Sequence, residues 1–303
     1  MATKKPKTST KSAKTKSAKP KTAAKTAVKT EIEAPKTNTV EKKSGFKGFF
    51  ARRYEGKEGV MTVFKTPKFY GALLGEVIGT LLLTMIIFSV FLLGPANIAT
   101  YAFALIAILI AVFAFSGACL NPIVVAGLMA TRNMSVIRGV MYIVAEVLGA
   151  WLGWLIFNGF HLAGGDGAMV GTPAMAEVAE NGFWPMAMVE IMGAIMIAFF
   201  ATRALKYKRS AFTYAAVFAG GIALAYVVGY VVSAAFLGFQ QGNNFVMNPA
   251  MALMLQIFPT AGEDFGQVFG IIMQALSLYV FLPMIAGVVG SYIAEFTSTL
   301  SEE

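Results

Sequence analysis

Two Asn-Pro pairs, Asn121-Pro122 and Asn248-Pro249, interrupt sequence that is otherwise apolar enough to cross a membrane. Proline lacks a backbone N–H and disfavours helical geometry in the residue before it, so each pair breaks a helix. The apolar piece that starts at each Asn has only 11 residues. As helix that is about 16 Å, or half a bilayer. Half-spans are tolerated at membrane depth only where they are buried in protein or line a cavity.

Six longer apolar segments are each long enough to cross a bilayer as a helix, which takes about 20 residues. Only 14% of the residues are charged and the mean hydropathy is +0.66, as expected for a polytopic membrane protein. We therefore predict an all-α membrane protein with six transmembrane helices and two half-spanning re-entrant helices. The predicted spans are residues 69–93, 98–115, 136–158, 183–203, 212–237 and 265–293.

The loop charges predict how the spans are oriented. Lys and Arg lie before span one, between spans two and three, and between spans four and five. The loops at 161–182 and 259–264 carry acidic residues and neither Lys nor Arg. The positive-inside rule then places both termini in the cytoplasm, and we expect a multi-pass plasma-membrane protein. With three spans and one half-span in each half, the halves form an inverted repeat.

The basic residues are concentrated in a tail. Residues 1–70 contain 19 Lys or Arg and 5 Glu, whereas the remainder of the chain is net acidic. The tail lacks the apolar residues needed for a core, so we predict a disordered cytoplasmic segment at 1–68. The channel-like body is predicted at 69–294 and a short cytoplasmic C-terminus at 295–303. A solvated tail is the favoured interpretation, and the alternatives are contact with anionic lipid and, less favoured, with nucleic acid.

The two half-helices are the strongest functional signal. Inverted topology points their N-termini, at Asn121 and Asn248, toward each other near the midplane, where their dipoles oppose cations. The Asn amides can donate to a passing solute or can serve only as helix caps. Glu76 and Glu190 lie deep in spans one and four. They either support the broken segments by accepting backbone hydrogen bonds or form a proton relay, and we favour support.

The residue inventory excludes several other functions. With one Cys and one His, the chain has no disulfide framework and no His/Cys metal cluster. We expect no enzyme, no catalytic residue, no metal and no cofactor.

Three motifs then point to a family. The segment SGACLNPIVVAGL at 116–128 resembles the first signature loop of the major intrinsic proteins, and FVMNPAM at 245–251 resembles the second. GEVIGT at 75–80 is similar to the signature of that family's first helix. The resemblance covers the whole membrane body and excludes the tail.

The resemblance implies an aquaporin-like homotetramer with a pore in each subunit for glycerol, water or other small neutral solutes. It assigns the pore centre to Asn121, Pro122, Ile123, Asn248, Pro249 and Ala250, with Cys119 as a further pore-lining or loop-supporting residue. By spacing from the Asn-Pro pairs it also implies a selectivity filter formed by Tyr101, Phe236, Phe245 and Met251.

The chain departs from the family pattern where selectivity is set. Met251 stands where the family almost always has Arg, Ile123 replaces Ala, and Cys119 replaces His. The predicted filter is therefore aromatic and poor in hydrogen-bond donors, which favours small neutral solutes of the glycerol class. The alternatives are a water-selective or largely non-conducting structural member of the family, and a coupled secondary transporter.

Overall fold

The computed structural model describes residues 64–93, 98–164, 183–207, 210–237, 245–255 and 265–300. The basic tail and the two acidic loops predicted from the sequence lie largely outside these residues. All elements assigned within them are helical. The longer helices of the first half are α3 (Pro67–Leu93), α4 (Ile98–Ser116) and α6 (Val136–Ala163). Those of the second half are α8 (Phe183–Ala204), α9 (Ala211–Leu237) and the joined segments α11 (Phe265–Leu276), η3 (Ser277–Phe281) and α12 (Leu282–Leu300).

The predicted all-α membrane architecture is confirmed. Within the described residues, five helices are long and apolar enough to cross a membrane, and α4 is a shorter apolar helix of 19 residues. The last helix continues to Leu300, beyond the predicted end of span six at residue 293. A short 3-10 turn, η2 (Leu205–Tyr207), follows α8.

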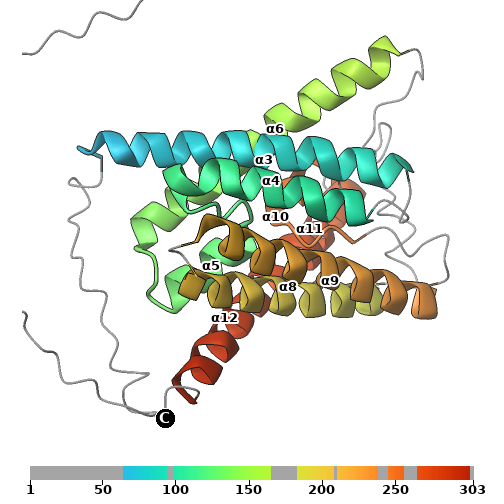
Figure 1. The fold of residues 1–303 in the computed structure, drawn as a ribbon. Helices are drawn as coiled ribbons and strands as arrows, with labels where there is room; N and C mark the ends of the chain where they lie inside the picture. The colour runs from blue at the N-terminus through green and yellow to red at the C-terminus, as the bar shows by residue number, and fades with distance from the viewer. Residues whose placement is uncertain are drawn as a thin grey trace, which may run out of the picture. The chain divides into compact units, whose positions relative to one another are not determined.

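The packing repeats between the two halves. In the first half α3 packs against α4 and α6, and in the second half α8 packs against α9 and α12. The halves meet where α4 contacts α9 (Figure 1). Each helix pair in the first half therefore has a counterpart in the second, as an inverted repeat requires.

The two half-helices pack against both halves of the bundle. They are α5 (Pro122–Ala130) and α10 (Pro249–Leu255), and they lie inside the bundle between the longer helices (Figure 1). Helix α5 packs against α12 of the other half, and α10 packs against α6. Because each half-helix contacts the opposite half, both are buried in protein, as half-spanning helices require.

Equivalent glycines allow the closest helix contacts. A Cβ atom on Gly149 of α6 would meet the backbone carbonyl of Val77, and one on Gly290 of α12 would meet that of Ile195. These glycines occupy the same position in the related motifs AEVLGA and AGVVGS. Small residues at such positions let membrane helices approach until their backbones touch.

The final span contains a π-helical segment that the sequence analysis did not predict. At η3 the N–H of Leu282 reaches back five residues to the carbonyl of Ser277. Pro283 follows directly, and a proline neither donates to the preceding turn nor fits against its carbonyl. The wider turn accommodates the proline without ending the helix.

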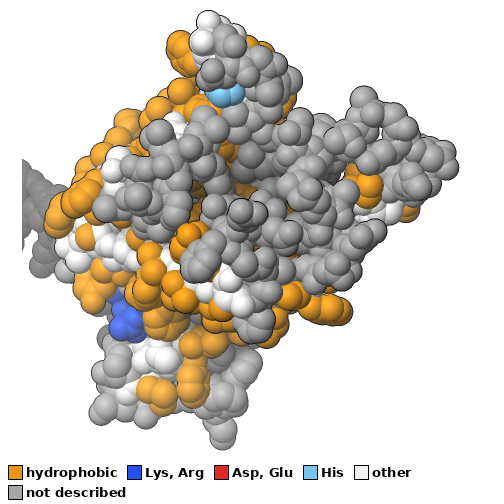
Figure 2. Space-filling view, turned by 90° about the vertical axis from the view of Figure 1, so that its right-hand side faces the viewer, with side chains coloured by type: hydrophobic (Ala, Val, Ile, Leu, Met, Phe, Trp, Pro, Cys, Tyr) orange, Lys and Arg blue, Asp and Glu red, His pale blue; other side chains and the backbone are white. Residues whose placement is uncertain are grey.

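The outside of the bundle is apolar. Figure 2 shows hydrophobic side chains over most of the described surface on one face, with one basic patch. Large apolar side chains are exposed on every long helix, and examples are Leu74, Phe103, Val144, Met188, Val231 and Ile285. An apolar surface of this extent is suited to lipid and not to water.

Candidate functional site

The two Asn residues cap the half-helices and also join the two broken segments. The Oδ1 atom of Asn121 accepts the N–H of Ile123 at 3.0 Å, and that of Asn248 accepts the N–H of Ala250 at 3.1 Å. Pro122 and Pro249 occupy the first helical positions, where a missing N–H costs nothing. Both Asn side chains are almost fully buried.

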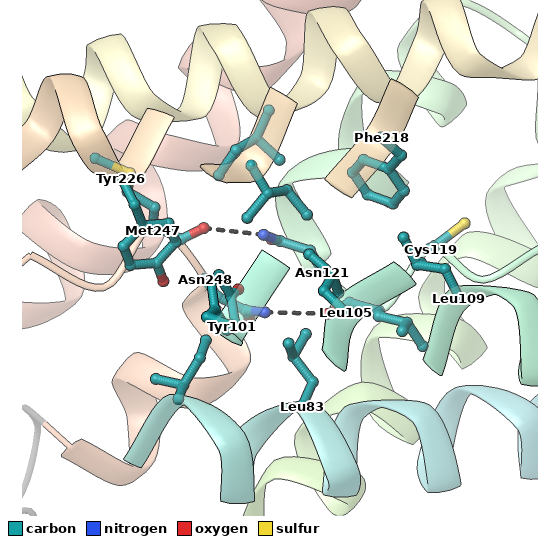
Figure 3. Close-up of a pocket in the computed structure, with 14 residues that line it drawn as sticks. Leu83, Tyr101, Leu105, Leu109, Cys119, Asn121, Phe218, Tyr226, Met247 and Asn248 are labelled. Atoms are coloured by element: carbon teal, nitrogen blue, oxygen red, sulfur yellow. Dashed lines mark hydrogen bonds between the residues drawn. The ribbon is translucent and has the colours of Figure 1, made fainter. Parts of the chain in front are cut away.

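Each Asn amide crosses to the other half of the molecule. Asn121 Nδ2 donates to the Met247 carbonyl at 2.9 Å, and Asn248 Nδ2 donates to the Leu120 carbonyl at 3.0 Å (Figure 3). An amide nitrogen has two N–H groups, so each retains one donor after this bond is made. Both Asn residues line a narrow cavity.

Leu120 and Met247 present these carbonyls through an unusual backbone conformation. Their φ angles are +53° and +51°, in the left-handed region that residues other than Gly seldom adopt. The Leu120 side chain packs where a Cβ atom on Gly79 would lie, and the Met247 side chain packs against Gly193 and Gly229 in the same way. Side-chain packing thus holds both residues in the conformation that accepts the Asn amides.

Buried carboxylates support the two broken segments. Glu76 accepts the N–H of Cys119 at 3.1 Å with one oxygen and the N–H of Leu120 at 2.8 Å with the other. Glu190 accepts the N–H groups of Val246 at 2.6 Å and Met247 at 3.0 Å. Both carboxylates are fully buried, and these bonds satisfy backbone donors that the helix breaks leave without a partner.

Tyrosines that the sequence analysis did not select support the same segments. Tyr142 donates to the Ser116 carbonyl and Tyr214 to the Gly117 carbonyl, each at 2.9 Å. Tyr226 donates to the Val246 carbonyl at 2.6 Å. The sequence alone could not select these tyrosines, because the structure is needed to show which face of each helix points toward the broken segments.

The cavity is lined from both halves with a regular spacing. Residues at four-residue intervals on α4 and on α9 face it, as expected for one side of a helix. Figure 3 shows Tyr101, Tyr226, Met247 and Asn248 at one end and Leu109, Phe218 and Cys119 at the other. The lining residues are Leu83, Ile87, Tyr101, Leu105, Leu109, Cys119, Leu120, Asn121, Ile197, Phe218, Ile222, Tyr226, Met247 and Asn248.

The other sequence-predicted residues are distributed around this cavity. Phe245 is buried with its ring centroid 5.6 Å from that of Tyr226, and it is not among the described lining residues. Met251, near the start of α10, is fully buried and likewise does not line the cavity. Ile123 and Ala250 are also fully buried. Phe236 is in the last turn of α9, but its side chain lies outside the part of the structure that is described.

The chain is similar to proteins that are already known. Residues 63–296 match the family described as Major intrinsic protein. "Probable aquaporin PIP2-6" of Oryza sativa subsp. japonica is 32% identical over 162 residues, which cover 47% of this chain and 55% of that protein. The chain thus spans about half the length of this curated relative. The X-ray structure of the aquaglyceroporin from Plasmodium falciparum aligns with a TM-score of 0.48 and 16% identity, over 76% of this chain and 96% of that one.

Proposed function

Because the chain belongs to the major intrinsic protein family, whose members are membrane channels, we propose that it passes small neutral solutes passively. Glycerol-class polyols, with or without water, are the proposed solutes, and each subunit of a homotetramer contains its own pore. We further propose that the channel lies in the plasma membrane with both termini in the cytoplasm. The loop charges and the inverted repeat support this orientation.

The crossed Asn amides are the observation that carries this proposal. Asn121 and Asn248 line the cavity from opposite halves, and each has one N–H left to donate to a solute oxygen. The half-helices begin at these residues, so their dipoles make the centre electropositive. A solute that accepts hydrogen bonds is stabilised there, whereas a cation is repelled.

The rest of the lining favours solutes that also carry C–H surface. Most of the described lining residues are Leu, Ile, Met or aromatic, and none is charged. An apolar wall cannot replace the hydration shell of an ion, but it contacts the carbon skeleton of a polyol at little cost. The carboxylates of Glu76 and Glu190 accept backbone N–H groups, which supports a structural role over a proton relay in a coupled transporter.

Vesicle swelling tests the proposal. Purified protein in proteoliposomes is exposed to a glycerol gradient and, separately, to an impermeant osmolyte that reports water flow. We expect glycerol uptake to exceed that of empty vesicles, to rise linearly with concentration and to be independent of a pH gradient. Glycerol uptake equal to empty vesicles with faster water flow would establish the water-selective alternative. Equality for both would establish the non-conducting one, and saturable, proton-dependent uptake would establish a coupled transporter.

The basic tail is proposed to bind the anionic cytoplasmic leaflet. Its 19 Lys or Arg residues within positions 1–70 outnumber its acidic residues, and each basic group near such a surface contributes about 1 kcal/mol. A peptide of residues 1–60 should bind vesicles that contain phosphatidylserine, release them at high salt, and ignore neutral vesicles. Tighter binding to duplex DNA than to anionic vesicles at equal ionic strength would favour nucleic acid as the partner.

A further inference from the structure

The side chain of Ile123 packs away from the cavity. It is fully buried, and it is not among the described residues that line the cavity. It forms a small apolar cluster with Ala194 and Ala198 of α8 and with Ala286 of α12. Ile123 is the second residue of α5, two positions after Asn121. A residue next to the pore centre therefore contacts the opposite half of the chain.

A hollow at Gly287 of α12 receives the Ile123 side chain. A Cβ atom on Gly287 would meet the Cγ2 atom of Ile123 and would lie 2.8 Å from the Ile123 carbonyl oxygen. A residue larger than Gly at this place would displace the side chain or the backbone of α5, because both contact α12 here. The fit of Ile123 against Gly287 therefore fixes how closely the start of α5 approaches α12.

The contact between α5 and α12 continues one turn farther along both helices. A Cβ atom on Gly127 would meet the Ser291 side chain, so here the hollow is on α5 and the larger side chain is on α12. The hydroxyl of Thr202 in α8 donates to Ser291 Oγ at 2.9 Å. Helix α5 is thus held against a part of the second half that is itself fixed by α8.

The inverted repeat contains the same contact with the sizes exchanged. Ala250 has the position in α10 that Ile123 has in α5, directly after the proline. Gly287 of the motif AGVVGS corresponds to Glu146 of AEVLGA in α6, and α10 packs against α6. A large half-helix residue is therefore matched by Gly in one half, and a small one by Glu in the other. This exchange indicates that packing volume accounts for the size of residue 123.

The backbone N–H of Ile123 connects this contact to the pore centre. It donates to the Asn121 Oδ1 atom at 3.0 Å and so orients the Asn121 side chain. The Nδ2 atom of the same side chain donates to the Met247 carbonyl at 2.9 Å. A shift of Ile123 relative to α12 would therefore change both bonds of Asn121 together.

We propose, building on the proposed function, that Ile123 is a positioning residue, whose packing against Gly287 holds the Asn121 amide in place at the cavity wall. The Ile123 side chain itself does not meet the solute. It keeps α5 at the depth where Asn121 donates to a solute oxygen. Hydrogen bonds weaken steeply with distance and angle, so a small displacement of α5 reduces this interaction.

Glycerol permeability of proteoliposomes, measured per folded channel, tests the assignment. Ile123→Val keeps the β-branch that meets Gly287 and should keep the wild-type permeability. Ile123→Ala removes the branch, and Ile123→Leu moves it one carbon farther from the backbone. Each should lower glycerol permeability by about fivefold, the factor that one hydrogen bond contributes. Gly287→Ala should act in the same direction, because the added methyl group displaces α5.

A double variant separates positioning from direct contact with the solute. When Ile123→Ala is combined with Gly287→Ala, the new methyl group fills part of the space that the Ile side chain leaves. The loss should then be smaller than the product of the two single losses. If Ile123 lined the pore, Ile123→Ala would widen it, raise glycerol permeability and act independently of Gly287. Either a raised permeability or independent effects would overturn the inference.

A control variant distinguishes positioning from a general loss of stability. Phe88→Leu weakens a buried ring contact with Phe157, between α3 and α6, and should leave the permeability per folded channel unchanged. Size-exclusion profiles and thermal unfolding in detergent establish that each variant is folded. Ile123→Leu has as many carbon atoms as the wild-type side chain, and it decides the test if Ile123→Ala is not recovered as folded protein.

The side-chain amide of Asn121 gives a second readout that does not depend on transport. In protein with isotope-labelled asparagine, its nuclear magnetic resonance signal is the one that Asn121→Ala removes. The signal should shift in Ile123→Ala and Ile123→Leu and should stay in place in Ile123→Val and Phe88→Leu. A signal that stays in place in Ile123→Ala and Ile123→Leu would overturn the inference.

The inference and the proposed function fail in different ways. Wild-type vesicles that pass neither glycerol nor water faster than empty ones would contradict the proposed function. The Asn121 amide signal would then still decide whether Ile123 positions this side chain. Wild-type vesicles that pass glycerol, with a permeability that Ile123→Ala and Ile123→Leu leave unchanged, would overturn the inference alone.

Discussion

The side-chain amide of Asn121 donates a 2.9 Å hydrogen bond to the backbone carbonyl of Met247, a residue from the other half of the chain. The side-chain amide of Asn248 in turn donates a 3.0 Å hydrogen bond to the backbone carbonyl of Leu120. The same side chains cap α5 and α10 through their oxygens. Each Asn therefore caps a half-helix, joins the two halves by a hydrogen bond and lines the cavity. No other residue type supplies an acceptor and two donors in so short a side chain.

Replacing Asn121 with Ala should destabilise the protein by about 2–3 kcal/mol, because it removes a cap and leaves the buried Met247 carbonyl without its donor. Asn248→Ala should have a similar effect. The double variant should lose less than the sum, since both bonds join the same two segments. Thermal unfolding in detergent measures the effect. Asn133→Ala, whose bonds are exposed, is the control and should shift stability little. Additive losses would show that the two ties act independently.

The two buried carboxylates should respond differently to the same substitution. Glu76 uses a separate oxygen for each backbone N–H, so Glu76→Gln places an amide N–H₂ against one donor. In Glu190 one oxygen lies 2.6 Å from the Val246 nitrogen and 3.2 Å from that of Met247, and the other lies 3.0 Å from the Met247 nitrogen. A Gln oxygen in the first position can therefore still accept both N–H groups. We expect Glu76→Gln to cost about 1–3 kcal/mol and Glu190→Gln less. Equal losses in thermal unfolding would contradict this difference.

The helical spans were predictable because apolar run length is a local property of the sequence. The predicted starts at residues 98, 136, 183 and 265 coincide with the starts of α4, α6, α8 and α11. The Asn-Pro pairs located the half-helices for a similar reason, since proline acts on its immediate neighbours. The contact of each half-helix with the opposite half then follows from the inverted repeat.

The wall of the cavity was less predictable from the sequence. Counting 12 residues back from Asn248 leads to Phe236, yet the described ring beside Tyr101 is that of Tyr226. The count runs through the connection between α9 and α10. It assumes that this connection has the length usual in the family, which a single sequence cannot establish. The left-handed backbone at Leu120 and Met247 was also unforeseen. It depends on packing against distant glycines, and neither Leu nor Met signals it locally.

Glu146 should tolerate replacement by Gln. It is fully buried beside Glu76, and neither of its oxygens makes a hydrogen bond of ordinary geometry within the described residues. A Gln amide can donate to the Glu76 carboxylate and removes one of two neighbouring acidic groups. We expect Glu146→Gln to keep its solute permeability and to match or exceed the wild-type thermal midpoint, by an effect on the order of 1–3 kcal/mol. A marked loss of stability, comparable to that of Glu76→Gln, would mean that Glu146 accepts a bond that the amide cannot.

Gly290→Ala should be among the most damaging small substitutions. The added methyl group would meet the Ile195 carbonyl, and backbone cannot move aside as a flexible side chain can. Separating α8 from α12 should cost about 1–3 kcal/mol. Gly149→Ala, at the equivalent place in the first half, should cost a similar amount.

Gly220→Ala is the matched control, because no atom outside its own helix lies within 4 Å of the added methyl group. It should stabilise α9 by up to about 1 kcal/mol. Thermal midpoints in detergent rank the three variants, and a Gly290→Ala protein as stable as Gly220→Ala would show that α8 and α12 do not need this close approach.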